Sequence, residues 1–246
     1  PVLSTINTSS NPTESGTIIG EGEYGAGSIC TLIATANEGY TFVNWTENGE
    51  VVSTEAIYSF EVTGDRNLVA NFEAIVPTVE QTVTLSAGWN WWSTYLDITL
   101  EQLETALGDS GLMIVDQNGS TASYHPAYGW GGTLQNIEVG KMYKINTAAA
   151  CSITLSGTVA APASHTITLN PGANWMGFVG SESLSLDEAL SNLTPTNLDN
   201  IKTPKGSATY YQGMGWRGSL NTLEPGKGYI YNSKAMDAKA FCFPTR

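Results

Sequence analysis

Hydrophobic and polar residues alternate in short runs along the first 75 residues, and glycine-rich turns separate the runs. Successive side chains of a strand point to opposite faces, so a period of two predicts β-strands. The Asn48-Gly49 pair strongly favours a two-residue hairpin. We therefore expect a small β domain without a helix. Its strands are predicted at Ser28–Ala36, Tyr40–Trp45, Ile57–Val62 and Asn67–Phe72.

The remaining two thirds of the chain repeat themselves. Residues 122–143 and 208–229 align at a constant offset of 86, with ten identities in 22 positions. Unrelated sequences would share about one or two of these positions, so the similarity indicates an internal duplication. The pattern Gly-x-Asn-Trp recurs as well, at 88–91 and again at 172–175.

The domain boundaries follow from these patterns. The first domain covers residues 1–75, and a short linker at 76–80 follows because Pro77 cannot continue a central strand. The two copies of the duplicated unit are expected at 81–160 and 161–246. Since the copies are adjacent and related, we expect them to pack through a pseudo-twofold or tandem interface.

Each copy is expected to contain several strands and one short helix. The first strands alternate and are rich in β-branched residues, at Thr82–Leu85 and Thr166–Leu169. Apolar residues at helical spacing follow Thr99 and Ser185, which are residue types that cap helices. This pattern predicts helices at Thr99–Leu107 and Ser185–Leu193. Later strands of the first copy are predicted near Met113–Val115, Ala122–Tyr124, Met142–Ile145 and Ser152–Leu155. The fold class is therefore mainly β, with an α+β duplicated unit.

Composition limits the possible partners. Ten Lys and Arg stand against 23 Asp and Glu, a net charge of −13 over 246 residues. Nucleic acids and anionic membranes repel such a chain, so we expect neither as a partner. The sequence has no run of about 20 apolar residues that could insert into a membrane. It also begins without the basic and apolar segments of a signal peptide, so we interpret it as a mature or excised fragment.

Residues that bind metals or cofactors are scarce. The histidines, His125 and His165, do not recur in the other copy, so we expect neither a metal site, nor a catalytic triad, nor a cofactor. Residues Asp116–Ser120 faintly resemble a calcium loop, but Asn-Gly is itself a turn signal, and an ordinary turn is favoured. Cys30 is expected to be buried. A disulfide between Cys151 and Cys242 is a less favoured alternative to free thiols.

Aromatic side chains are the best candidates for a binding site, because they offer large rigid contact surfaces and stack on sugar rings. Trp130 and Trp216 follow a glycine in each copy, a context typical of a loop or hairpin tip. Trp92 is replaced by Met176 in the second copy. We therefore predict ligand contacts at Trp92, Tyr128, Trp130 and Trp216, with a core role for all these tryptophans as the alternative. For Trp91 and Trp175 the core role is favoured. No acidic residue lies in a distinctive motif, so we expect no catalytic residue.

A set of short motifs covers most of the first domain: Asn11-Pro12, Gly16-Thr17-Ile18, Gly20–Tyr24, Gly39–Trp45, Asn48-Gly49 and Leu68–Phe72. This set resembles the internalin B-repeat family, in particular its divergent bacterial relatives. The resemblance implies a small β domain related to the β-grasp fold, of a kind strung along secreted and cell-wall proteins. It also implies a spacer or binding module without catalytic residues.

The duplicated unit carries the patterns Gly-x-Asn-Trp, Tyr-x(4)-Gly-Trp-x-Gly-x-Leu and, at Glu224–Tyr229, Glu-Pro-Gly-Lys-Gly-Tyr. These resemble a duplicated unit of bacterial surface proteins assigned to adhesion. The first copy departs from the last pattern, with Val139 in place of proline and Met142 in place of glycine, which we expect to affect turn rigidity more than function.

The resemblances and the acidic composition together favour a non-catalytic module of a secreted or cell-surface bacterial protein that works in cell adhesion. Its partner would be a protein or a glycan on a cell or matrix surface. The alternative is a carbohydrate-binding appendage of a larger extracellular protein, supported by the aromatic residues.

Overall fold

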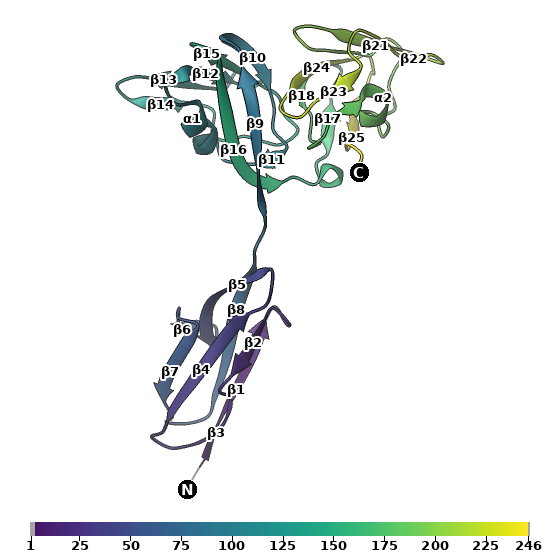
Figure 1. The fold of residues 1–246 in the computed structure, drawn as a ribbon. Coiled ribbons are helices and arrows are strands. Elements are labelled where there is room, and N and C mark those ends of the chain that lie inside the picture. Colours follow the sequence, from purple (N-terminus) through teal and green to yellow (C-terminus); the bar gives the residue numbers. More distant parts are fainter. Residues whose placement is uncertain (1–2, 246) are drawn as a thin grey trace. The chain divides into compact units, whose positions relative to one another are not determined.

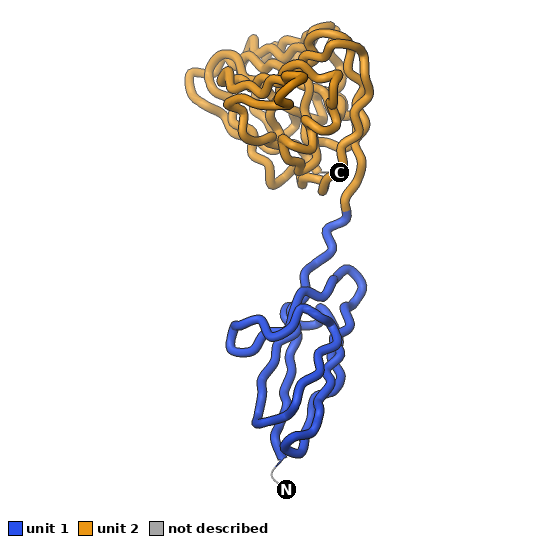
Figure 2. The backbone as a smooth tube through the Cα atoms, turned by 90° about the vertical axis from the view of Figure 1, so that its left-hand side faces the viewer, with its two compact units in different colours: residues 1–77 blue, residues 78–246 orange. Residues whose placement is uncertain are grey.

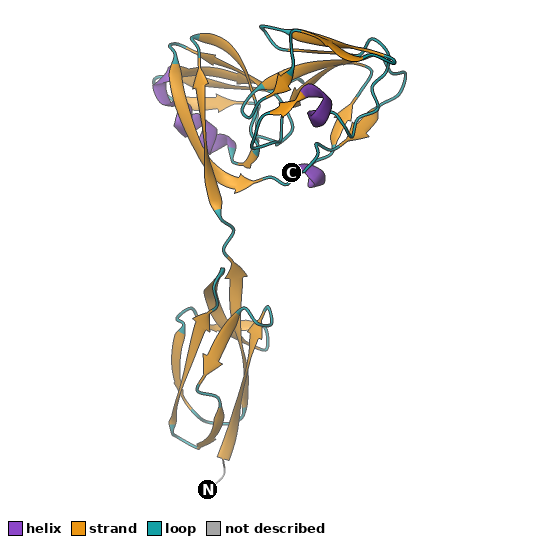
Figure 3. Ribbon diagram, turned by 45° about the vertical axis from the view of Figure 1, so that its right-hand side comes forward, coloured by secondary structure: helices purple, strands orange, loops and turns teal. Residues whose placement is uncertain are grey.

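The structure is a computed structural model that describes residues 3–245. The chain forms two compact units, Pro1–Pro77 and Thr78–Arg246 (Figure 2). Strands dominate both units, and the helices of the described residues all lie in the second one (Figure 3). The mainly β fold class predicted from the sequence is confirmed.

Unit 1 consists of two β-sheets that share one core. One sheet has the strand order β3-β1-β8-β5-β6 and the other β2-β4-β7 (Figure 1). The core draws Ile6 and Leu68 from the first sheet and Leu32 from the second. The strands are β1 (Leu3–Asn11), β2 (Gly16–Ile19), β3 (Gly22–Gly25), β4 (Ile29–Ala36), β5 (Tyr40–Glu47), β6 (Glu50–Ser53), β7 (Ile57–Glu61) and β8 (Arg66–Ala74).

The hairpin and the buried cysteine of unit 1 are as predicted. Asn48 and Gly49 join β5 to β6 with φ angles of 52° and 86°, the left-handed geometry that this pair favours. Cys30 is fully buried on β4. All three cysteines are free, so Cys151 and Cys242 do not form a disulfide.

The segment between the two units is shorter than the predicted linker. Strand β8 ends at Ala74 and β9 (Thr78–Leu85) begins four residues later. Residues 78–80 are therefore part of a strand, in which Thr78 pairs with Thr158 and Glu80 with Ser156. Alternation of Val79 with charged and β-branched neighbours continues the strand backwards from Thr82, a signal that Pro77 obscured.

The first copy of the duplicated unit packs one helix and a three-stranded sheet around a five-stranded sheet. The orders are β11-β16-β9 and β10-β15-β12-β13-β14. Helix α1 (Leu100–Leu107) begins at the predicted cap, where Thr99 and Gln102 form a reciprocal capping box. The further elements are β10 (Gly88–Trp92), β11 (Leu96–Asp97), β12 (Gly111–Val115), β13 (Thr121–His125), β14 (Gly129–Gly132), β15 (Tyr143–Thr147) and β16 (Cys151–Val159), with a 3-10 turn at Gly108–Ser110.

The second copy repeats the five-stranded sheet element by element. Its order, β18-β24-β20-β21-β22, matches that of the first copy strand for strand, as duplication predicts. Two small sheets, β17-β25 and β19-β23, complete it. The elements are β17 (Ile167–Leu169), β18 (Gly172–Gly177), β19 (Leu184–Ser185), α2 (Leu186–Ala189), β20 (Asn200–Lys202), β21 (Ser207–Tyr211), β22 (Gly215–Gly218), β23 (Thr222–Leu223), β24 (Gly228–Ser233) and β25 (Lys239–Phe241), with a 3-10 turn at Pro162–Ser164.

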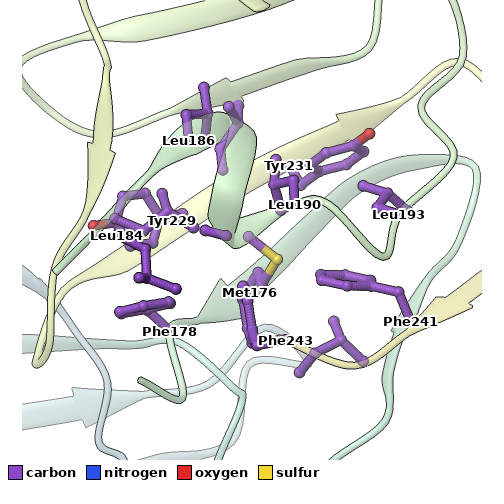
Figure 4. Close-up of a cluster of buried hydrophobic side chains, with 14 of the residues drawn as sticks. Met176, Phe178, Leu184, Leu186, Leu190, Leu193, Tyr229, Tyr231, Phe241 and Phe243 are labelled. Carbon is purple, nitrogen blue, oxygen red and sulfur yellow. The ribbon is translucent and has the colours of Figure 1, made fainter. Parts of the chain in front are cut away.

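Helix α2 is shorter than predicted. It starts at the expected cap, Ser185, which forms a capping box with Glu188, but it ends at Ala189. Leu190 and Leu193 are nevertheless buried in the core (Figure 4). Helical spacing thus identified the buried residues correctly. Leu190 and Leu193 lie in irregular turns after the helix, and Pro195, two residues beyond Leu193, disfavours continuation of a helix.

The two copies pack through reciprocal backbone contacts. Lys141 of the first copy forms an antiparallel bridge with Met176 of the second. At the equivalent positions, Lys227 of the second copy forms a bridge with Trp92 of the first. Strands β10 and β18, which carry Trp92 and Met176, are the edges of their five-stranded sheets. Each copy therefore covers part of the open sheet edge of the other.

Hydrogen bonds beside these bridges follow the same symmetry. The backbone N–H of Gly177 donates to the carbonyl oxygen of Gly140 at 2.9 Å. The equivalent N–H of Ser93 donates to the carbonyl oxygen of Gly226 at 3.3 Å. The hydroxyl of Ser93 adds a bond of 2.6 Å to the carbonyl of Lys227, which glycine cannot match. Of the two arrangements expected from the sequence, pseudo-twofold or tandem, the reciprocal contacts show the pseudo-twofold one.

Equivalent residues meet near the pseudo-twofold axis, and their sizes are complementary. A Cβ atom built on Gly177 would lie 2.7 Å from the Cβ atom of its counterpart, Ser93. One built on Gly228 would lie 2.1 Å from Cγ of its counterpart, Met142. A larger side chain in one copy thus requires glycine in the other. Met142 affects packing between the copies, which was not expected from the sequence.

An exchange of the two residues tests this complementarity. Met142→Gly should lower the free energy of unfolding of unit 2 by about 2–4 kcal/mol through loss of a buried side chain. Gly228→Met should cost about 1–3 kcal/mol or more through overpacking. In the double variant the methionine is restored from the opposite side, so urea denaturation should show a loss well below the sum. Additive losses would contradict the account.

One ion pair in unit 1 joins the neighbouring strands β5 and β8. The guanidinium of Arg66 on β8 contacts the carboxylate of Glu47 on β5 through several hydrogen bonds, the shortest 2.6 Å. Arg66 also lies over the ring of Phe60, 4.2 Å from its centroid. These hydrogen bonds to Arg66 lower the pKa of Glu47 below its ordinary value.

Glu47→Gln is expected to destabilise unit 1 by about 1–2 kcal/mol at pH 7, measured by urea denaturation of residues 1–77. A lowered folded-state pKa contributes stability above the unfolded pKa, about 4.3, and this contribution is lost as the pH falls through the folded pKa. The variant should therefore approach the original protein in stability at pH 3. The exposed Glu50→Gln serves as the control. An equal deficit at both pH values would show that the ionised pair is not the cause.

Candidate functional site

The Gly-Trp-x-Gly motif builds a strand and not a hairpin tip. Trp130 lies in β14 and Trp216 in β22, each the edge strand of its sheet. The last glycines of the motif, Gly132 and Gly218, both have φ of 154°. A Cβ atom on either would lie within 2.1 Å of a carbonyl oxygen of the neighbouring strand. The last glycine of the motif is therefore required because two strand backbones approach each other closely at this position.

The indoles of this motif belong to the cores, which corrects the prediction for them. Trp216 is only 8% exposed and packs against Tyr210 and Tyr231, with ring centroids 5.5 and 6.0 Å away. Trp130 is partly buried against the core of the first copy, and its Nε1 is buried. A side chain on Gly111 would collide with the Trp130 ring. Trp216 therefore has no free face for stacking, whereas Trp130 packs against the core and keeps only part of its surface exposed.

Trp92 is also a core residue, contrary to the prediction. It is fully buried at the interface between the copies, beside the bridge to Lys227. Its replacement by Met176 in the second copy suggested a dispensable position. Met176 is buried as well, so both copies fill the position with a large apolar side chain, and the exchange conserves burial.

The side chains at two further repeated positions form hydrogen bonds with backbone groups. In the Gly-x-Asn-Trp pattern, the amide nitrogens of Asn90 and Asn174 donate to three carbonyl oxygens each, two of them in the preceding turn. The phenol oxygens of Tyr143 and Tyr229 accept the backbone N–H groups of Glu138 and Glu224. Burial raises the pKa of Tyr143 to about 12. The repeated motifs thus specify the fold.

Tyr128 is the one predicted site residue that is open to solvent, with 87% of its surface exposed. It lies at the tip of the β13–β14 hairpin, where its ring contacts that of His125 at 4.8 Å. Nδ1 of His125 accepts the backbone N–H of Ala127, which fixes the turn. The equivalent tip of the second copy presents Met214, 58% exposed. The two hairpins lie at opposite ends of unit 2 (Figure 1), so they do not form one surface.

A second aromatic group lies on the outer faces of the two five-stranded sheets, where the sequence favoured core roles. Trp91 on β10 and Trp175 on β18 are equivalent and both half-buried. Nζ of Lys144 on β15 lies 5.7 Å from the ring centroid of Trp91 and 4.3 Å from that of Trp175. The ammonium group therefore joins the two copies through cation–π contacts.

Trp89 extends this surface away from the interface. It is 52% exposed and shares a strand face with Trp91, two residues further along β10. Its cross-strand partner is Asn146, whose half-buried side chain makes no hydrogen bond to the described residues. We define these five residues, Trp89, Trp91, Lys144, Asn146 and Trp175, as the indole–lysine surface.

Sequence reasoning missed this surface because it treated the tryptophans one by one. Trp91 and Trp92 are consecutive, so in a strand only one of them can face the core. Both copies have an apolar residue at the position of Trp92, while Trp89 and Lys144 have Ala173 and Ile230 as counterparts. The sequence did contain a signal for this surface: Trp89 shares a strand face with Trp91, and its residue type is not kept in the second copy, as expected for a position outside the core.

A cleft of about 460 Å³ also lies between the copies. Its rim is polar and includes Asn118, Asn136 and Thr168, while Met142 and Met176 lie deeper. The adjoining Asp116–Ser120 segment is a turn in which the Asp116 carboxylate accepts the backbone N–H of Ser120. Within residues 3–245, no His, Cys, Asp and Glu side chains form a group that could hold a metal ion. None of the described helices is long and apolar enough to cross a membrane.

The comparisons with known proteins concern unit 1. Residues 6–76 match the family model of the divergent InlB B-repeat domain. No curated protein and no solved structure matches the chain. The matched residues extend from β1 to the end of unit 1, and they include every motif on which the resemblance was based. Unit 1 is therefore similar to the divergent InlB B-repeat domain over nearly its whole length, as the motifs predicted.

Proposed function

We propose that this chain is a non-catalytic binding module of a bacterial surface protein and works in cell adhesion. The family of unit 1 is typical of bacterial surface proteins. The observation that carries the proposal is the indole–lysine surface. Large aromatic side chains outside the cores are typical of recognition surfaces, because they bind with little loss of conformational entropy.

The placement of the acids supports a role without catalysis. Among residues 3–245, Asp199 is the only fully buried carboxylate. It accepts the hydroxyl of Tyr231 at 2.6 Å and two backbone N–H groups, so its hydrogen bonds join segments of the second copy. A carboxylate with these partners stabilises the fold.

An extracellular position agrees with the composition. Charged residues make up only 13% of the chain, and Gly, Ser, Thr and Asn supply much of the polar surface. A tandem of a β-repeat domain and a duplicated β-rich unit suits a protein that projects a binding surface from a cell. Its partner would be a protein or a glycan on a cell or matrix surface.

Carbohydrate binding is the second candidate function. The observation that favours it is the pairing of exposed Trp89 with the amide of Asn146 across the β10–β15 pair. An indole face stacks on the apolar face of a sugar ring, while an amide donates to and accepts from hydroxyl groups. The surface is thus suited to an appendage that holds a glycan.

An adhesion assay tests the proposed function. Beads coated with the whole chain should adhere to at least one of immobilised mucin, collagen and fibronectin, more strongly than beads coated with residues 1–77. Trp89→Ala should weaken the interaction about 10-fold or more, because central aromatic contacts carry much of the binding energy. The exchange leaves both cores intact.

The matched control is Met236→Ala, which removes another exposed apolar side chain, 91% exposed and in the same unit. It should leave adhesion unchanged. If the whole chain adheres to every surface no better than residues 1–77, the adhesive function is wrong. If Tyr128→Ala and not Trp89→Ala abolishes adhesion, the binding site lies at the hairpin tip.

A further inference from the structure

Lys144 is a cation without a counter-ion among residues 3–245. Residues 81–160 contain only two cations, Lys141 and Lys144. Lys141 forms an ion pair with Glu138 at 2.8 Å. Lys144 makes no ion pair or hydrogen bond to the described residues, and its ammonium group lies against the rings of Trp91 and Trp175. This is unexpected in a chain with 23 acids and ten bases.

The two indoles hold Lys144 in place and leave its hydrogen-bonding capacity unused. A lysine ammonium has three N–H donors, and an aromatic ring replaces none of them as a hydrogen-bond acceptor. Two rings and half-burial restrict the long side chain, which otherwise loses rotamer entropy when it binds a ligand. Lys144 is therefore a preorganised donor for an anionic group.

The neighbouring residues determine what carries that anion. Trp89 and Lys144 are diagonal cross-strand neighbours, because Trp91 pairs with Lys144 and Trp89 with Asn146. Diagonal Cα atoms lie about 7–8 Å apart. One ligand of the size of a sugar ring can therefore stack on the exposed indole while its charged group reaches the ammonium. Asn146 lies between them on the same face and can bind a hydroxyl group.

The geometry disfavours an acidic peptide. A peptide that binds a sheet usually adds a strand to an open edge through backbone hydrogen bonds. The edge beside the indole–lysine surface is β10, and Lys227 and Gly226 of the second copy already bond to its end at Trp92 and Ser93. The available contacts are flat aromatic faces, one amide and one cation.

We propose that the indole–lysine surface binds a carboxylated sugar, with the ring stacked on Trp89 and the carboxylate on Lys144. The proposal rests on the proposed binding function and names the ligand class of that surface. Trp89 and Lys144 have Ala173 and Ile230 as counterparts in the second copy. Each chain therefore has one such site, on the side of the first copy.

Isothermal titration of the whole chain tests the proposal with matched sugars. The probes are sialyllactose against lactose, and trigalacturonic acid against the same trisaccharide with its carboxyl groups reduced. At least one carboxylated sugar should bind about 10-fold more tightly than its neutral counterpart at low salt. The preference should shrink at 0.5 M NaCl, because salt screens a partly exposed ion pair. The pair that shows it identifies the source of the carboxylate as a sialic or a uronic acid.

Three variants separate the contributions. Lys144→Met keeps an apolar chain between the indoles and should abolish the preference, leaving the neutral sugar unaffected. Lys144→Arg should retain the preference, which excludes a loss of fold as the cause. Trp89→Ala should weaken both sugars of a pair. The Met236→Ala control should change neither. Near-ultraviolet circular dichroism checks that each variant keeps its aromatic packing.

Equal binding of charged and neutral sugars, or a preference that survives in Lys144→Met, would overturn the proposal. Adhesion that depends on Trp89 with no binding of any probe sugar would also overturn it, while the adhesive function would stand. Conversely, a Lys144-dependent preference in a chain that does not adhere would support the sugar site and remove the adhesive function.

Discussion

Complementary packing on the pseudo-twofold axis determines the structure of the duplicated unit. A twofold relation brings equivalent positions together, so two identical large side chains cannot both occupy the axis. Met142 faces Gly228 there, and Ser93 faces Gly177. The copies have thus diverged into two different halves that fit each other. The same packing allows the reciprocal backbone bridges, in which Lys141 pairs with Met176 and Lys227 with Trp92.

The interface has two consequences beyond stability. It covers the ends of β10 and β18, two sheet edges that would otherwise be open to other chains. It also brings Trp175 of one copy to Lys144 of the other. The indole–lysine surface therefore exists only in the assembled unit, and its residues on the first copy alone would lack one of the two rings that hold the lysine.

The sequence predicted the features that depend on local pattern. Alternation located most strands, Asn48-Gly49 located a hairpin, and Thr99 and Ser185 marked the starts of both helices. The offset of 86 between the copies predicted the matching strand orders of the two large sheets.

What the sequence could not provide was the face on which each aromatic residue lies. A glycine before Trp130 suggested an exposed tip, whereas Trp130 lies in a strand, and Gly132 of the same motif is the residue whose neighbouring backbone leaves no room for a side chain. Trp91 and Trp92 are consecutive and have the same sequence neighbours. Only the pairing of β10 with β15 determines which of the two side chains faces the core. Similarly, the role of Gly228 depends on Met142, which lies in the other copy.

Separate expression of the two copies tests the central claim most directly. Residues 78–160 and 161–246 each lack the surface that covers Trp92 or Met176. We predict that neither fragment alone has the near-ultraviolet circular dichroism of the intact unit, and that mixing them restores it in a 1:1 complex measured by light scattering. Residues 78–160 should not form an ordered homodimer, because Met142 would face itself. Two fragments that fold as stable monomers and do not associate would contradict the account.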